Sequence, residues 1–224
     1  MTFPEYEALS APPTASVTTR TTNVKIVEEI DAEGEVAAQY EYFRSHFGRP
    51  NVPGILKCFA THPPLLRHMM ALSESMLFSD GHLGRRHKEM IATFVSVENA
   101  CHYCADSHGF FLRIHGGSGE VLDALGRSET NSKAFTPAEQ ALLTLVQKVN
   151  LNSSRITPED TEVLRGFGWN ELQIAEAIHI TALFSTFNRV ANAFGLESQG
   201  LLAFCKGQSS ATDEASKVIE RGTR

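Results

Sequence analysis

Apolar residues recur along this chain at intervals of three and four positions, which is the spacing that lines one face of an α-helix. The runs rich in valine and isoleucine keep the same spacing. We found no segment with the strict alternation of apolar and polar residues that is typical of a half-buried strand. The pattern therefore predicts an all-α fold.

Capping residues indicate where the helices begin. Thr136 and Thr157 each precede a proline and acidic residues, a pattern typical of a capped first turn, and Asn170 precedes the longest apolar run. Glycines mark several of the expected ends, since they adopt the left-handed conformation that closes a helix. The predicted helices cover 34–47, 53–60, 63–78, 101–115 and 118–126, one further helix around Glu89, and, counting their caps, 136–149, 157–166 and 170–194.

The composition along the chain suggests one folded domain with two flanking segments. Residues 1–33 are rich in Thr, Pro and Ala and show little periodicity, so we expect an extended or disordered leader. Residues 34–206 hold the predicted helices, and residues 207–224 form a polar tail. The helix at 170–194 is apolar nearly all round, which is typical of a helix covered on every side. We expect it at the centre of the bundle or also in a subunit interface.

Charge and composition exclude several classes of function. Twenty basic and twenty-six acidic side chains give a net charge of −6, which argues against nucleic acid or an anionic membrane as the main partner. No stretch approaches the roughly 18 apolar residues of a membrane span, and the N-terminus shows no secretory signal. We therefore expect a cytoplasmic protein. Four cysteines are too few for a disulfide framework, and Cys58 and Cys205 are expected to be buried thiols.

The richest chemistry lies between Glu89 and His108, where Cys101 and Cys104 form a CxxC pair. We predict that Asn99 caps the helix that carries this pair. Residues three apart in a helix have Cα atoms on the order of 5 Å apart, within the range that a disulfide accepts. A position in the first helical turn also lowers the pKa of a thiol, most strongly for Cys101. The geometry therefore favours reversible thiol redox chemistry.

Other interpretations of these residues stay open on the sequence alone. The pair could bind a metal ion, although Cys101 and His108 lie roughly 10 Å apart along one helix axis, too far for three ligands of a tetrahedral ion. It could also be inert. Glu89 could form a solvated pair with Arg85 or Arg86, but it also lies on a stripe of small residues against which a second helix could pack closely.

The chain resembles the alkylhydroperoxidase D-like, or carboxymuconolactone decarboxylase, superfamily, and within it the peroxidase-related branch. The pattern Glu-x11-Cys-x2-Cys-x3-His carries the resemblance, which extends over roughly residues 40–205. Four further segments have the look of that superfamily: P-x-L-L near 64–66, L-x-R-R-x-K-E-M-I-A at 83–92, V-S-x-x-N-x-C-x-Y-C at 95–104 and F-N-R-V-A-N-A-F-G-L-E at 187–197.

The resemblance implies an all-helical fold that reduces hydroperoxides through a reversible Cys101–Cys104 disulfide. Cys104 matches the peroxidatic thiol that becomes a sulfenic acid, and Cys101 matches the proton donor and resolving thiol. Glu89 and His108 match the proton-relay acid and imidazole. The best-studied branch has a histidine immediately before the second cysteine, whereas this chain has Tyr103.

The implied partners are a hydroperoxide substrate and an external dithiol or disulfide reductase, with no cofactor and no metal ion, in a homo-oligomer. Two alternatives remain. One is a decarboxylase acting on a muconolactone-type acid, whose relatives need no CxxC pair. The other is a helical protein without enzymatic activity, whose dithiol senses redox state or helps to bind a partner.

Overall fold

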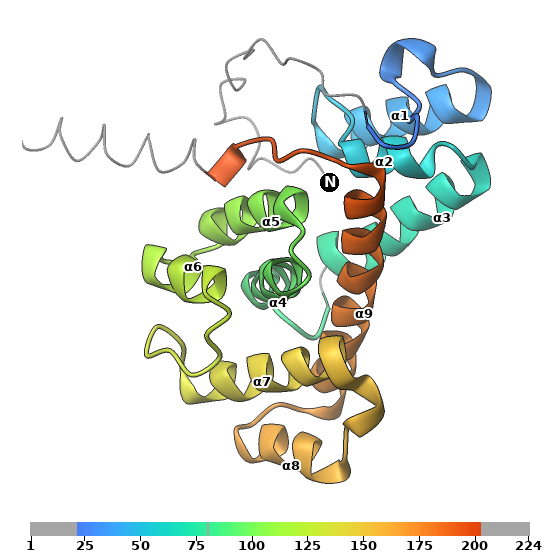
Figure 1. The fold of residues 1–224 in the computed structure, drawn as a ribbon. Coiled ribbons are helices and arrows are strands. Elements are labelled where there is room, and N and C mark those ends of the chain that lie inside the picture. The colour runs from blue at the N-terminus through green and yellow to red at the C-terminus, as the bar shows by residue number, and fades with distance from the viewer. Residues whose placement is uncertain (1–21, 80, 203–224) are drawn as a thin grey trace, which may run out of the picture.

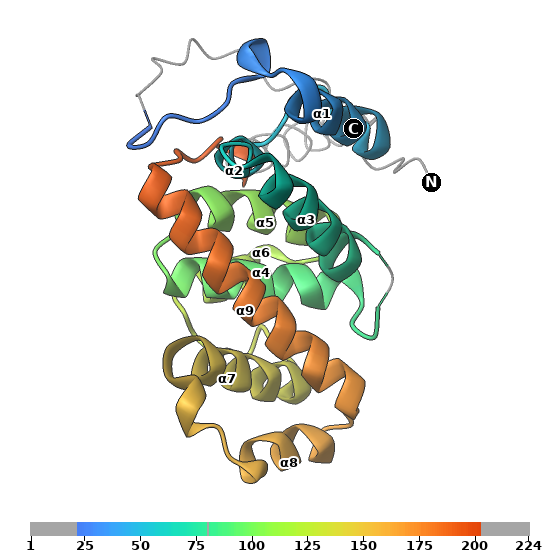
Figure 2. The ribbon, with the colours of Figure 1, turned by 90° about the vertical axis from the view of Figure 1, so that its right-hand side faces the viewer.

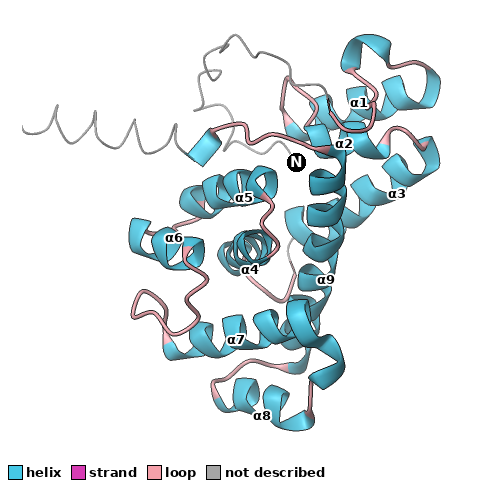
Figure 3. Cartoon of the chain, in the orientation of Figure 1, coloured by secondary structure: helices cyan, strands magenta, loops and turns pink. Residues whose placement is uncertain are grey.

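The computed structural model describes residues 22–79 and 81–202, and within these residues every regular element is a helix (Figure 3). The all-α prediction is confirmed. Residues 1–21 of the expected leader, the polar tail at 207–224 and Cys205 lie outside the described residues. The α-helices are α1 (Gly34–Phe47), α2 (Gly54–Phe59), α3 (Pro63–Ser73), α4 (Arg85–Glu98), α5 (His102–Ile114), α6 (Gly119–Gly126), α7 (Pro137–Asn152), α8 (Pro158–Gly166) and α9 (Glu171–Phe194).

Most predicted boundaries are confirmed, because they depend on local capping. Thr136 and Thr157 form capping boxes at α7 and α8, and Asn170 accepts hydrogen bonds from the first turn of α9. Gly195 ends α9 in the left-handed conformation. The helix predicted at 63–78 differs, since it is α-helical only to Ser73 and continues as a π-helical turn over Glu74–Phe78.

Helix α4 lies at the centre of the bundle and is seen end-on in Figure 1, surrounded by α5, α6, α7 and α9. Every α4 residue from Lys88 to Ser96 is buried, including the polar ones. Helix α9 runs diagonally across the molecule and contacts α2, α4, α5, α7 and α8 (Figure 2). Within one chain α9 is not covered on every side, because Leu172 is 56% exposed. None of the described helices is both long and apolar enough to cross a membrane.

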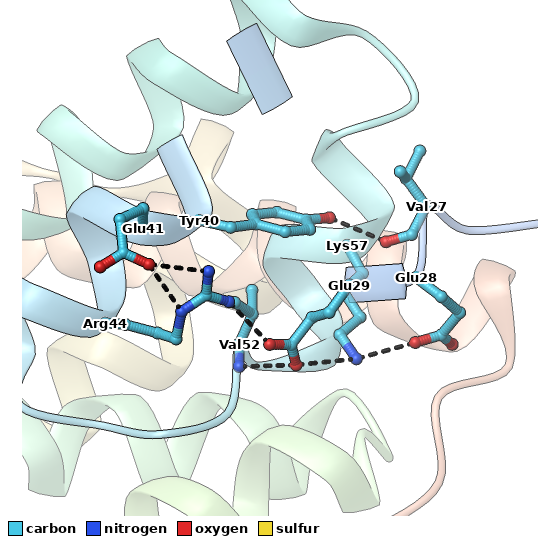
Figure 4. Close-up of polar contacts among 8 residues, drawn as sticks. All are labelled: Val27, Glu28, Glu29, Tyr40, Glu41, Arg44, Val52 and Lys57. Carbon is cyan, nitrogen blue, oxygen red and sulfur yellow. Dashed lines mark hydrogen bonds and ion pairs between the residues drawn. The ribbon is translucent and has the colours of Figure 1, made fainter. Parts of the chain in front are cut away.

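A polar cluster joins the segment before α1 to the first two helices (Figure 4). Residues 22–33 contain one regular element, a 3-10 turn at Glu29–Asp31. The Glu29 carboxylate accepts hydrogen bonds from Arg44 of α1, at 2.9 Å, and from the backbone N–H of Val52, at 3.0 Å, and it pairs with Lys57 of α2 at 3.4 Å. These contacts hold the segment before α1 against α1 and α2.

A buried ion pair joins α4 to α9. The Lys88 ammonium lies 2.8 Å from the Glu176 carboxylate, and Lys88 is 1% exposed. The carboxylate also accepts the backbone N–H groups of His82 and Leu83, at 2.7 and 2.6 Å. The segment that leads into α4 is therefore held against α9 by charge as well as by packing.

Candidate active site

The turn between α4 and α5 places Cys101 at the start of the dithiol helix. Ala100 adopts a left-handed conformation, with φ of 51°, and the Cys101 N–H donates to the Ser96 carbonyl at 2.8 Å. Together with the bond from the Ala100 N–H to the Val97 carbonyl, this is a Schellman ending of α4. The prediction that Asn99 caps the dithiol helix is wrong, because Asn99 closes α4 and Cys101 is itself the N-cap of α5.

Of the two thiols, Cys101 is the more acidic. Hydrogen bonding with Cys104 is the main cause that lowers the pKa of Cys101, to about 7. Burial acts in the opposite direction and raises this pKa, while the backbone N–H groups of Cys104 and Tyr103 lower it further. The same hydrogen bond, together with burial, raises the pKa of Cys104. The pair therefore carries its negative charge on Cys101, with the Cys104 S–H as donor. This agrees with the helix-dipole argument from the sequence.

Glu89 is fully buried and contacts both Arg85 and His108, so it does not form a solvated pair. Its carboxylate accepts Arg85 Nε on Oε1 at 2.7 Å, and its Oε2 lies 2.6 Å from His108 Nδ1. Burial raises the pKa of Glu89, but His108 and Arg85 lower it by more, so the net pKa lies below the ordinary value. The carboxylate is therefore ionised at neutral pH. It binds Nδ1 of the imidazole and leaves Nε2 as the nitrogen for proton transfer.

An apolar cavity of about 90 Å³ reaches both Cys104 and His108. The edge of the His108 ring packs against Phe184, with centroids 4.5 Å apart. Cys104 lines this cavity and Cys101 does not, although the two thiols are hydrogen-bonded to each other. The polar lining consists of Arg49, Ser73, Tyr103, Cys104, Ser107, His108 and Gln199; most of the apolar lining comes from α1, α2, the π-helical turn, α5 and α9.

Tyr103 has a different role from that of a relay histidine. Its hydroxyl accepts a hydrogen bond from the backbone N–H of Ile55 at 3.3 Å, at the first turn of α2. Burial raises the pKa of Tyr103, so the phenol stays protonated at neutral pH. The side chain therefore joins α5 to α2 at the wall of the cavity.

One buried residue at the site was not assigned a role from the sequence. Asn188 of α9 is 0% exposed and hydrogen-bonds with both Cys101 and Cys104. The only sequence signal was its place in the F-N-R-V-A-N segment, where a polar residue interrupts an apolar helix face. A third thiol, Cys58, is also buried, and burial raises its pKa to about 12. Among residues 22–79 and 81–202, no three His, Cys, Asp or Glu side chains are grouped to hold a metal ion.

Comparison with known proteins shows what the chain is similar to. Residues 63–148 match the model of the carboxymuconolactone decarboxylase family. No curated protein matches the chain. Among solved structures, the alkylhydroperoxidase AhpD core of an uncharacterized peroxidase-related protein from Ralstonia eutropha is 25% identical, over 82% of this chain and 95% of that one, with a TM-score of 0.72.

Two further structures support the fold. An uncharacterized peroxidase-related protein from a Silicibacter species is 27% identical, over 80% of this chain and 95% of that one, with a TM-score of 0.67. The debrominase Bmp8 in complex with 2,3,4-tribromopyrrole is 17% identical, over 86% and 98% of the two chains, with a TM-score of 0.65. The likeness to the debrominase shows the fold alone.

Proposed function

We propose that this chain is a thiol-dependent peroxidase of the alkylhydroperoxidase D-like superfamily. Its residues 63–148 match the model of the carboxymuconolactone decarboxylase family, and its fold is similar to that of a peroxidase-related protein at 25% identity. It reduces hydroperoxides through a reversible Cys101–Cys104 disulfide. One observation supports this most strongly: Cys104 and His108 line the same apolar cavity, and the Cys104 thiol is hydrogen-bonded to a more acidic Cys101. The apolar lining suits the organic part of an alkyl or aryl hydroperoxide.

We assign the attack to Cys104, because Cys104 lines the cavity and Cys101 does not. As the Cys104 sulfur bonds to the distal peroxide oxygen, its proton passes to the Cys101 thiolate and the O–O bond breaks. The departing alkoxide takes a proton from His108, which Glu89 holds at Nδ1. Such a positioned proton donor contributes about 10²–10⁴-fold in rate. The products are an alcohol and a Cys104 sulfenic acid.

The second half of the cycle forms the disulfide. His108, now neutral, takes the proton from Cys101, and the Cys101 thiolate attacks the sulfenic sulfur. The S–O bond breaks, and the leaving hydroxide takes that proton from His108 and departs as water. Both sulfurs lie in the first turn of α5, so the disulfide forms before a second oxidation can make the sulfinic acid.

Turnover requires an external dithiol or a disulfide reductase, which reduces the disulfide by thiol exchange. This requirement fits the cytoplasm, where such donors are kept reduced. We also propose that the chain acts as a homo-oligomer, because exposed apolar residues such as Leu172 of α9 could be covered by a second copy. Light scattering of the full chain tests that part independently of the chemistry.

The test is consumption of cumene hydroperoxide by the full chain with a dithiol donor, compared among three variants. Cys101→Ser and Cys104→Ser should each abolish turnover. Cys58→Ser is the matched control, because it removes a buried thiol of high pKa outside the pair, and it should retain activity. Two thiols that survive the hydroperoxide unchanged, or stoichiometric zinc in the purified protein, would end the peroxidase proposal. A decarboxylase would need neither thiol, so its lactone-acid activity would survive both substitutions.

A sulfenic-acid trap decides which thiol attacks. With limiting hydroperoxide, Cys101→Ser should accumulate a trapped sulfenic acid on Cys104. If the trap labels Cys101 in Cys104→Ser, and never labels Cys104 in Cys101→Ser, the roles of the two thiols are reversed.

A further inference from the structure

A chain of side-chain amides runs from α7 through α4 to α9 and ends at the dithiol. Asn99 and Asn150 exchange two amide hydrogen bonds, each of 3.1 Å. The second N–H of the Asn99 amide donates to Asn188 Oδ1 at 3.0 Å. Ser185 donates its hydroxyl to Asn150 Oδ1 at 2.7 Å, which fixes that amide in turn.

The bonds around Asn188 can run in only one direction. The Ser96 hydroxyl donates to the Ala92 carbonyl at 2.7 Å, so its oxygen must accept the 3.0 Å bond from Asn188 Nδ2. The Asn188 oxygen is already used by Asn99. The Asn188 amide is therefore held with its nitrogen toward Ser96 and its oxygen toward Asn99, and it cannot flip without breaking both bonds.

An amide nitrogen has two N–H groups, and Ser96 accepts only one of them. The Asn188 side chain also hydrogen-bonds with Cys101 and with Cys104. Asn188 is 0% exposed, so no solvent competes for the second N–H. The Ser96 carbonyl also accepts the Cys101 N–H at 2.8 Å, so the residue that binds the Asn188 amide nitrogen lies beside the first cysteine. A buried N–H donor next to a sulfur favours the anionic form of that sulfur.

We propose that Asn188 is a positioning residue for the dithiol, whose second amide N–H binds the anionic sulfur and follows the negative charge from Cys101 to Cys104. The proton transfer between the two thiols in the proposed cycle moves that charge, and one donor that contacts both sulfurs stabilises it in both positions. Only the effect on turnover depends on the proposed peroxidase function. The effect on thiol ionisation does not.

The test measures the ultraviolet absorbance of the thiolate against pH in the reduced full chain, without any peroxide. Asn188→Asp keeps the shape of the side chain but replaces the N–H donor with an acceptor. It should raise the pKa of Cys101 by about one unit or more, which is roughly a tenfold loss of thiolate below that pKa. Turnover of cumene hydroperoxide near neutral pH should fall by at least a similar factor and recover in part at higher pH.

The matched control is Asn192→Asp, one turn further along α9. Asn192 is exposed and donates only to the Asn99 carbonyl, at 3.1 Å, so its replacement should leave the thiol pKa unchanged. If Asn188→Asp does not fold, Asn188→Ala provides the same measurement without a buried charge. A folded Asn188 variant with an unchanged thiol pKa would overturn the proposal. A shifted pKa in a chain without peroxidase activity would support it while the proposed function fails.

Discussion

The buried ion pair between α4 and α9 gives a stability prediction that can be worked out from the structure. Lys88 precedes Glu89 on α4, and its ammonium also donates to the carbonyls of Met76 and Ser79, at 3.0 and 3.2 Å. The substitution Lys88→Met keeps most of the length of the side chain but removes its positive charge. The Glu176 carboxylate then keeps only its two backbone donors in a buried position.

Removing one partner of a buried pair costs about 3–5 kcal/mol of unfolding free energy, because the remaining charge is uncompensated. In the wild type, burial raises the pKa of Glu176, but Lys88 and the N–H groups of Leu83 and His82 lower it by more. A carboxyl with a lowered folded pKa stabilises the fold above its unfolded pKa. In Lys88→Met the folded pKa rises instead, so the variant loses stability as pH increases through that value. The deficit should therefore be larger near pH 7 than near pH 5.

Urea unfolding followed by far-ultraviolet circular dichroism measures this deficit at both pH values. Lys57→Met is the matched control. Lys57 pairs with the half-exposed Glu28 at 2.8 Å and with Glu29 at 3.4 Å, and both carboxylates are partly exposed, so its replacement should cost at most about 1 kcal/mol. Adding Glu176→Gln to Lys88→Met should restore much of the loss, since the amide is neutral and still accepts a backbone N–H. The reasoning is refuted if Lys88→Met costs no more than Lys57→Met, or if its cost does not depend on pH.

Three other changes test the site and its surroundings. Glu89→Gln should keep the fold but lower kcat/KM for cumene hydroperoxide by about 10²-fold or more, because His108 loses the anion that holds it; a smaller loss in steady-state assays would exclude the relay. Ala100→Gly should raise the free energy of unfolding by about 0.5–1 kcal/mol in urea titrations, since φ of 51° disfavours a side chain; a loss would contradict this. In the reduced wild type, thiolate absorbance should rise around pH 7, and Cys101→Ser should abolish that rise. If the first rise comes near the ordinary cysteine pKa of about 8.5, Cys101 does not carry the negative charge at neutral pH.

The sequence predicted the helices well because their ends are local events. Thr136, Asn170 and Gly195 each act on backbone groups within one turn, so their identity alone indicates a boundary. The ending of α4 was harder to predict. A non-glycine residue, Ala100, takes the left-handed position there, and Asn99, which is a common N-cap, closes a helix instead. The identity of the residue alone does not show whether an asparagine begins the next helix or ends the previous one.

The chemistry was predicted less completely because it depends on packing. Glu89 and Arg85 could form the same i,i+4 pair on a solvated surface, and only the helices around α4 make that carboxylate buried. Asn188 is separated from Cys101 by 87 positions of sequence, counting from 101 to 188, and nothing local indicates that its amide faces a sulfur. Such contacts follow from tertiary structure rather than from residue type.

In the structure, the more acidic thiol and the thiol that lines the cavity are different residues, which bears on how the dithiol could work. Cys101, at the N-cap of α5, is the thiol whose pKa is lowered, while Cys104 lines the cavity. If one sulfur were both exposed and anionic, any oxidant could attack it before its partner was in place. In the proposed cycle, with the charge on Cys101, the Cys104 sulfur becomes nucleophilic only as its proton moves to Cys101. The acid that forms there is the thiol needed for the next step, so attack and resolution are coupled through one shared proton.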